Sequence, residues 1–183
     1  MSFSIAGERY EGAADFHGYV AAARKHAELW NGLYRTLSID QTLIDRIKSI
    51  SGRWHLLVLS EHWCADAVST VPFLARLAEQ VPSLDLRILP RDENPDLMDA
   101  HLTNGTRSIP VVMVLDDDFV EHGWWGPRPT ELQRWFHAEG AALTMEERHK
   151  SKRQWYARDR GVSTIREVLA LLERATGATT ARG

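Results

Sequence analysis

The stretch SEHWCADAVST, Ser60 to Thr70, contains the only cysteine of the chain, Cys64. The apolar run WHLLVLS (Trp54–Ser60) leads into it and predicts a strand buried on both faces. The apolar spacing after the cysteine, up to Val81, predicts a helix. A thiol between a strand and a helix is typical of redox sites, which ordinarily carry a second cysteine three residues later. That position is Ala67, so the sequence poses the question of what one such thiol does alone.

Length and composition predict a globular chain with an ordinary core. The 183 residues are 44% hydrophobic and 26% charged, which suits one domain with an appendage. The net charge of −3 argues against nucleic acid or an anionic membrane as partner. No apolar run approaches the roughly 18 residues of a membrane span. One cysteine permits no internal disulfide, and the first residues lack a signal-peptide layout, so we expect a cytoplasmic location.

The pattern downstream of Trp54 predicts an α/β fold with the order β-α-β-α-β-β-α. Strands are expected at 54–60, 84–89, 111–115 and 119–125, and helices at 64–81, 94–102 and 130–139. This order predicts a mixed, partly parallel sheet that has helices on both sides and ends in an antiparallel hairpin. The triplet DDD at 116–118 suits the hairpin turn better than a calcium site, because the further ligands of a calcium loop are missing.

Helical segments flank this central region and suggest three parts. Residues 1–52 are expected to form a helical extension packed on the core, with one helix over 14–34 and a short one capped by Ser38. Residues 53–140 would form the central domain. Residues 141–183 would form an antiparallel helical hairpin (145–159 and 164–175) and a tail. Its second helix carries an apolar stripe that must be covered by the domain or by a second copy, which leaves a homodimer open. The stripe consists of Ile165, Val168, Leu169 and Leu172.

Residues 54–139 resemble the thioredoxin superfamily in four features that occur in the family's order. Trp63-Cys64 matches the start of its Trp-Cys-x-x-Cys motif, and Pro72 matches the proline inside the following helix. Ile109-Pro110 opens a strand as the family's cis-proline does, and Gly126 matches a family glycine. The resemblance implies a thioredoxin-like fold, a cis peptide bond before Pro110 and thiol–disulfide chemistry at Cys64.

Two departures from the family pattern bear on that chemistry. The resolving cysteine is replaced by Ala67, giving the motif WCxDA. The buried aspartate to which the family assigns proton transfer for the second thiol is replaced by Val58. Both parts that close an internal disulfide are therefore missing, whereas the attacking thiol is kept.

The reactivity of Cys64 is open between two interpretations. At the first turn of a helix, unpaired N–H groups and the helix dipole would favour the thiolate, whereas a buried lone cysteine is commonly an inert small hydrophobe. Negative charges at Glu61 and Asp66 would raise its pKa if they lie close. Asp66 is a first-turn carboxylate or a proton acceptor beside the thiol, and Glu61 is a solvated loop residue or a local base.

The resemblance also implies a substrate groove beside Cys64. Trp63 would shape its rim, and the backbone of Ile109 before Pro110 would pair with an extended substrate as an added strand. Arg107 flanks the same groove, where it would steer an anionic partner or remain solvated. We therefore take Cys64, Trp63, Asp66 and Glu61 as candidate catalytic residues, and Ile109, Pro110 and Arg107 as candidate substrate-binding residues.

Other chemistries fit the sequence less well, and we expect neither a metal nor an organic cofactor. His62, Cys64 and Asp66 alternate, but no second pair of ligands completes a metal site. A thiol peroxidase would resemble Thr-x-x-Cys, and Glu61 holds the threonine position. The motif CADA does not match the CGFS pattern of monothiol proteins that share an iron–sulfur cluster.

Two functions of different classes remain open. The first is a monothiol redox protein, in which the Cys64 thiolate forms a mixed disulfide with a protein disulfide or a low-molecular-weight thiol partner and an external thiol resolves it. The second is a redox-inactive binding module that keeps the cis-proline groove. The pH dependence of Cys64 alkylation would discriminate between them.

Overall fold

The computed structural model describes residues 7–177, and a four-stranded mixed sheet lies at its centre. Its helices are α1 Gly7–Glu11, α2 Phe16–Ala21, α3 Ala27–Thr36, α4 Gln41–Lys48, α5 Ala65–Gln80, α6 Pro95–Ala100, α7 Thr130–His137, α8 Met145–Asp159 and α9 Val162–Ala175. Its strands are β1 Trp54–Ser60, β2 Leu84–Pro90, β3 Val111–Leu115 and β4 Glu121–Trp125. Short 3-10 turns, η1 Arg91–Glu93 and η2 Glu139–Ala142, follow β2 and α7.

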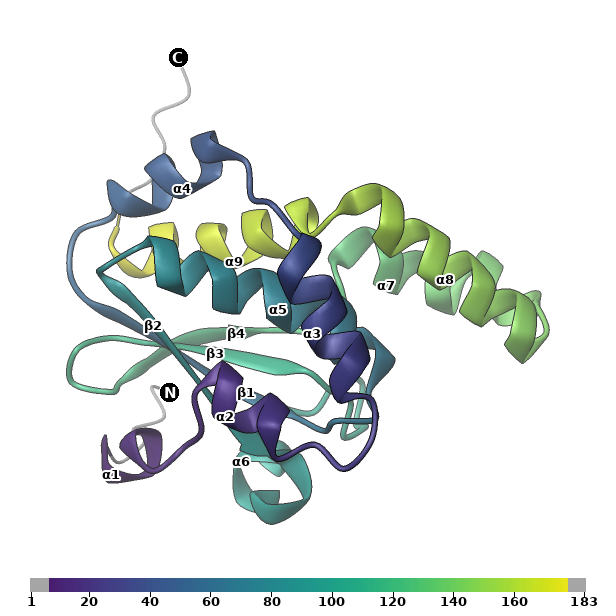
Figure 1. Cartoon of the computed structure of the whole chain (residues 1–183), viewed down its shortest axis with the longest axis horizontal. Coiled ribbons are helices and arrows are strands. Elements are labelled where there is room, and N and C mark those ends of the chain that lie inside the picture. Colours follow the sequence, from purple (N-terminus) through teal and green to yellow (C-terminus); the bar gives the residue numbers. More distant parts are fainter. Residues whose placement is uncertain (1–6, 178–183) are drawn as a thin grey trace.

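The sheet has the strand order β2-β1-β3-β4, with β1 and β2 parallel and the other two pairs antiparallel. This confirms the predicted α/β architecture and its terminal hairpin. Strands β1 and β3 are buried along their whole length, as expected for central strands covered on both faces. Figure 1 shows α5 and α9 on one side of the sheet and α6 on the other. Strand β1 therefore delivers the segment after Ser60 to the edge of a rigid core.

The N-terminal segment is broken where the sequence predicted one continuous helix. Helix α2 ends at Ala21 and α3 begins at Ala27, with His26 in the left-handed region at φ 67°. The break lets both short helices direct apolar residues toward the core. Phe16 of α2 and Tyr34 of α3 stack there, with ring centroids 4.7 Å apart. The next helix, α4, is capped by Asp40, whose carboxylate accepts the Thr42 N–H at 2.8 Å, and not by the predicted Ser38.

The two C-terminal helices do not form the predicted antiparallel hairpin. They extend to opposite sides of their junction and do not lie side by side: α8 projects outward beside α7, and α9 lies in the helical layer beside α5 (Figure 1). The junction is formed by Arg160 and Gly161, both in the left-handed region. The predicted tail lies partly outside the described residues, from 178 onward.

Helix α9, which the sequence assigned to an appendage, covers the sheet. It packs on β4, β3 and α5, and its apolar stripe is almost completely buried. By contrast, Leu132 is the one buried residue of α7, which contacts mainly η2 and α8. The physical reason is the larger apolar face of α9, whose burial on the sheet removes more apolar surface from water. The boundary at residue 140 therefore stays a prediction from the sequence. Residues on both sides of it contribute to one hydrophobic core.

Candidate functional site

Cys64 is the N-cap of α5, at the point where β1 ends and the helix begins. Its side chain is 7% exposed. The Sγ atom accepts the Ala67 N–H at 3.4 Å, and its S–H group donates to the Ile109 carbonyl oxygen at 3.4 Å. The cysteine thus takes the place of the oxygen side chain that usually caps a helix. Helix α5 continues through Pro72 to Gln80.

The segment opposite the sulfur is the Ile109–Pro110 turn, whose peptide bond is cis in this structure. Gly126 lies against it, with φ at +132°, and a Cβ atom added there would collide with the Pro110 carbonyl oxygen. Only glycine fits so close an approach. Gly126 is followed by a second cis bond to Pro127, and the loop then brings Arg128 toward α5.

Asp66, in the first turn of α5, is buried at the centre of a polar cluster. Its Oδ1 accepts the Tyr156 hydroxyl at 2.8 Å. Its Oδ2 accepts the Lys152 ammonium at 3.1 Å and the Arg128 guanidinium at 3.0 Å. Asp66, Lys152 and Tyr156 are 5%, 7% and 9% exposed. Both carboxylate oxygens are therefore occupied, and two positive charges face one negative charge.

The partners of Asp66 are functional candidates that sequence reasoning missed. Lys152 and Tyr156 stand four residues apart in α8 and so share one face of that helix. Most residues of α8 are polar, so the spacing of this pair is the local sign that one face of the helix is buried. Arg128 follows the conspicuous segment WWGPRP, but nothing in that segment names Asp66 as its partner.

Burial raises the pKa of the Cys64 thiol, which acts against the thiolate that the helix start favours. The Ala67 N–H acts in the opposite direction and lowers the pKa. Among the charges, Asp66 raises the thiol pKa and Lys152 lowers it. The pKa of Tyr156 is also raised, mainly by burial and then by the charge of Asp66. The thiol and the phenol therefore both keep their protons to higher pH than they would in water.

The remaining candidates near the sulfur have structural contacts of their own. Trp63 is 57% exposed, with the Arg91 guanidinium 5.3 Å from its ring centroid, so it forms a surface rim. Glu61 uses its carboxylate to accept the Asp92 N–H at 3.0 Å. His62 stacks on Tyr19, with centroids 4.1 Å apart. In the part of the chain that the structure describes, none of these three side chains hydrogen-bonds to the sulfur.

Arg107 is paired rather than free. Its guanidinium donates two hydrogen bonds of 2.7 Å to Asp99, and both side chains are about half exposed. Its own carbonyl oxygen accepts from Arg91 at 3.2 Å. The structure therefore brings Cys64, Ile109 and Pro110 together and places Arg107 on the surface beside them, with its charge offset by Asp99.

The positions of the missing second thiol and missing acid are both closed by apolar side chains. Ala67 is fully buried beside the sulfur. Val58 is fully buried in β1, between Ile88 and Val112 on the neighbouring strands. Within residues 7–177 no group of three acidic, histidine or cysteine side chains could hold a metal ion, and no helix is long and apolar enough to cross a membrane.

Comparisons with known proteins agree with this geometry. A protein-family model described as thioredoxin matches residues 13–150, a span that includes α2, α3 and α4 before β1. The fold is similar to a solved protein of unknown function from Pseudomonas aeruginosa, with a TM-score of 0.74 and 23% identity, covering 94% of this chain and 99% of that one. It is also similar to an HIV epitope-scaffold, with a TM-score of 0.72 and 22% identity, covering 91% and 96%. No curated protein sequence matches the chain.

Proposed function

This chain belongs to the thioredoxin family, and we propose that it is a monothiol exchange protein whose Cys64 forms a mixed disulfide that an external thiol resolves. The observation that carries the proposal is the position of Cys64 at the start of α5, 3.4 Å from the Ile109 carbonyl oxygen, with Ala67 where a second thiol would stand. The position of the family's attacking thiol is kept, and a chain with one cysteine cannot close an internal disulfide.

The reaction has two exchange steps. The Cys64 sulfur, once deprotonated, attacks one sulfur of a disulfide; a new S–S bond forms, and the other sulfur leaves as a thiolate that takes up a proton from water. An external thiolate then attacks the partner's sulfur in the mixed disulfide and forms a disulfide with it. Cys64 leaves as a thiolate and is reprotonated. Each step exchanges one S–S bond for another, so the external thiol supplies the reducing equivalents.

The cluster around Asp66 supports this role by setting the charge near the sulfur. Asp66 is held by three donors, so we propose it as an anchor and not as the proton acceptor that the sequence allowed. The charge of Asp66 raises the thiol pKa, and the charge of Lys152, which binds Asp66, lowers it. A positive charge stabilises an anion formed nearby, most strongly in a water-poor site. Lys152 is then a positioning residue that counters Asp66 and favours the departing and attacking Cys64 thiolate.

One observation favours the alternative, a redox-inactive binding module. Cys64 is buried and its pKa is raised, mainly by that burial. Under this alternative the groove of Ile109 and Pro110 would bind an extended segment without turnover. The thiol would then be inert at all accessible pH values.

The deciding experiment is incubation with oxidised glutathione followed by intact mass measurement. We expect one glutathione per chain, none on Cys64→Ser, and full release by added thiol. Alkylation across pH should show a rate that climbs with thiolate formation. A wild-type chain that stays unmodified after long incubation at alkaline pH would leave only the binding module.

A second experiment restores the missing partner. In Ala67→Cys the new side chain belongs to the residue whose backbone N–H already donates to Cys64 Sγ. An internal disulfide needs Cα atoms about 4.4–6.8 Å apart. We expect this variant to oxidise internally and to gain weak dithiol reductase activity, kept low because Val58 supplies no proton acceptor. Two thiols that remain free under mild oxidant would refute the proposed geometry.

A further inference from the structure

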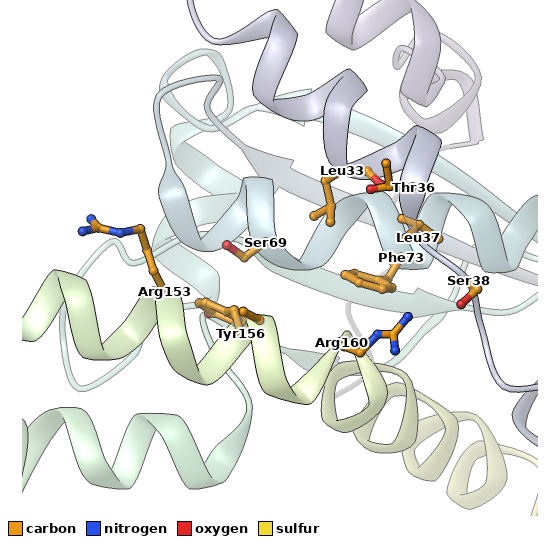
Figure 2. A pocket seen from close by; sticks show the side chains of 10 residues that line it. Leu33, Thr36, Leu37, Ser38, Ser69, Phe73, Arg153, Tyr156 and Arg160 are labelled. Carbon is orange, nitrogen blue, oxygen red and sulfur yellow. The ribbon is translucent and has the colours of Figure 1, made fainter.

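A cavity of about 370 Å³ lies between α3, α5 and α8, away from the groove of Pro110. Its volume is in the range of small-molecule sites. Figure 2 shows Leu33, Leu37 and Phe73 on one side and the Tyr156 ring across from them. These side chains give the cavity an apolar floor and walls.

The walls are fixed by contacts outside the cavity. The Tyr156 ring lines it while the Tyr156 hydroxyl is held by Asp66 at 2.8 Å. Phe73 is buried against Gly161, where an added Cβ would collide with the ring. A cavity with such anchored walls is largely formed before a ligand arrives, which lowers the entropic cost of binding.

The charge around the cavity has one sign. Arg153 and Arg160 line it, and no acidic residue does. Within residues 7–177 neither guanidinium has an acidic partner. Arg160 extends from the end of α8 toward the segment carrying Ser38, whereas Arg153 points away at the opposite end (Figure 2). Arg160 and Ser38 therefore form one polar end of the cavity, whose lining also includes the hydroxyl residues Thr36 and Ser69.

We propose that this cavity binds a small amphipathic anion, a carboxylate on an apolar body. The carboxylate accepts hydrogen bonds from Arg160 and Ser38, and the apolar body packs between Phe73, Leu33 and the Tyr156 ring. A guanidinium is suited to such a group because its planar N–H donors match the two carboxylate oxygens. The site is separate from the thiol groove, and its existence does not depend on the proposed exchange activity.

The test uses octanoate, below its micelle concentration, added to the ¹⁵N-labelled full chain and followed by amide chemical shifts. We expect saturable shifts at residues 33–38, 69–73 and 153–161. Arg160→Gln should weaken binding about five- to tenfold, as loss of a partly exposed charge-assisted pair implies. Arg158→Gln, on the same helix but outside the cavity lining, is the matched control and should bind as the wild type does.

A filling variant and a neutral ligand separate the two parts of the proposal. Ala157 is exposed and lines the cavity, so Ala157→Phe should block octanoate binding while the melting temperature stays unchanged. Octanol, which lacks the charge, should bind more weakly than octanoate. Absent or scattered shifts, octanol binding as tight as octanoate, or equal affinities for the Arg160 and Arg158 variants would overturn the proposal.

Discussion

Helices α8 and α9 follow each other with two residues between them, yet they bury opposite kinds of side chain. Helix α9 covers the sheet with an apolar stripe, whereas the buried side chains of α8 are Lys152 and Tyr156, both bound to Asp66. The apolar stripe contributes free energy through area removed from water. The polar pair also buries the Tyr156 ring and the Lys152 stem, but the net energy of its buried polar groups depends on complete hydrogen bonding. The contrast teaches that α9 serves mainly stability and α8 mainly the thiol site.

The largest effect should follow from a cavity under α9. Leu169 is 1% exposed, and Leu169→Ala should lower the free energy of unfolding by about 2–5 kcal/mol in urea denaturation. The alkylation rate of native Cys64 should hardly change. Arg166→Ala, an exposed position on the same helix, is the control and should stay within about 0.5 kcal/mol. A loss confined to thiol reactivity would reverse the roles of the two helices.

A smaller loss of stability is expected when α8 loses one hydrogen bond. Tyr156→Phe removes the donor to Asp66 Oδ1 and leaves a buried carboxylate oxygen unpaired, which should cost about 1–3 kcal/mol. The same change in an Asp66→Ala background, which has no side-chain acceptor, measures the pair itself, since Tyr156→Phe should then cost little. Additive losses in the double variant would show that the hydroxyl acts through another contact.

Lys152→Met should change the pKa of the Cys64 thiol more than it changes the stability of the fold. Burial already raises the Cys64 pKa and Lys152 lowers it, so removing the ammonium should raise it further. The further rise of this pKa should slow alkylation at a fixed pH below the pKa, because a smaller fraction of the thiol is then ionised. The rate-against-pH curve should shift to higher pH, and Lys150→Met, exposed on the same helix, should leave it in place. An unshifted curve would remove Lys152 from the site.

The smallest effect concerns the pH dependence of stability. The folded thiol has a raised pKa, so it keeps its proton where the unfolded thiol has lost it. Its contribution is therefore complete below about pH 8.5 and is lost as pH rises through the folded pKa, with a slope of no more than about 1.4 kcal/mol per pH unit. Wild type should lose stability relative to Cys64→Ser as pH rises above about 8.5. A constant difference across that range would contradict the raised pKa.

The positions of most elements near the site could be predicted from local sequence. The apolar run up to Ser60 became β1 with the predicted bounds, and the helix predicted over 145–159 became α8, capped by Thr144. These features are local because strand burial and helix capping depend on residues a few positions apart. The break at His26 was missed, because the apolar spacing continued across it.

The sequence by itself determined the thioredoxin architecture, the place of Cys64 before a helix and the absence of a second thiol. Only the tertiary structure decided the environment of that thiol. Asp66 meets Arg128, Lys152 and Tyr156 across 62, 86 and 90 residues of chain, and α9 rather than α7 covers the sheet. Burial and charge pairing depend on every group that the fold brings near the sulfur. Burial, together with the charge of Asp66, therefore raises a thiol pKa that the helix start alone would lower.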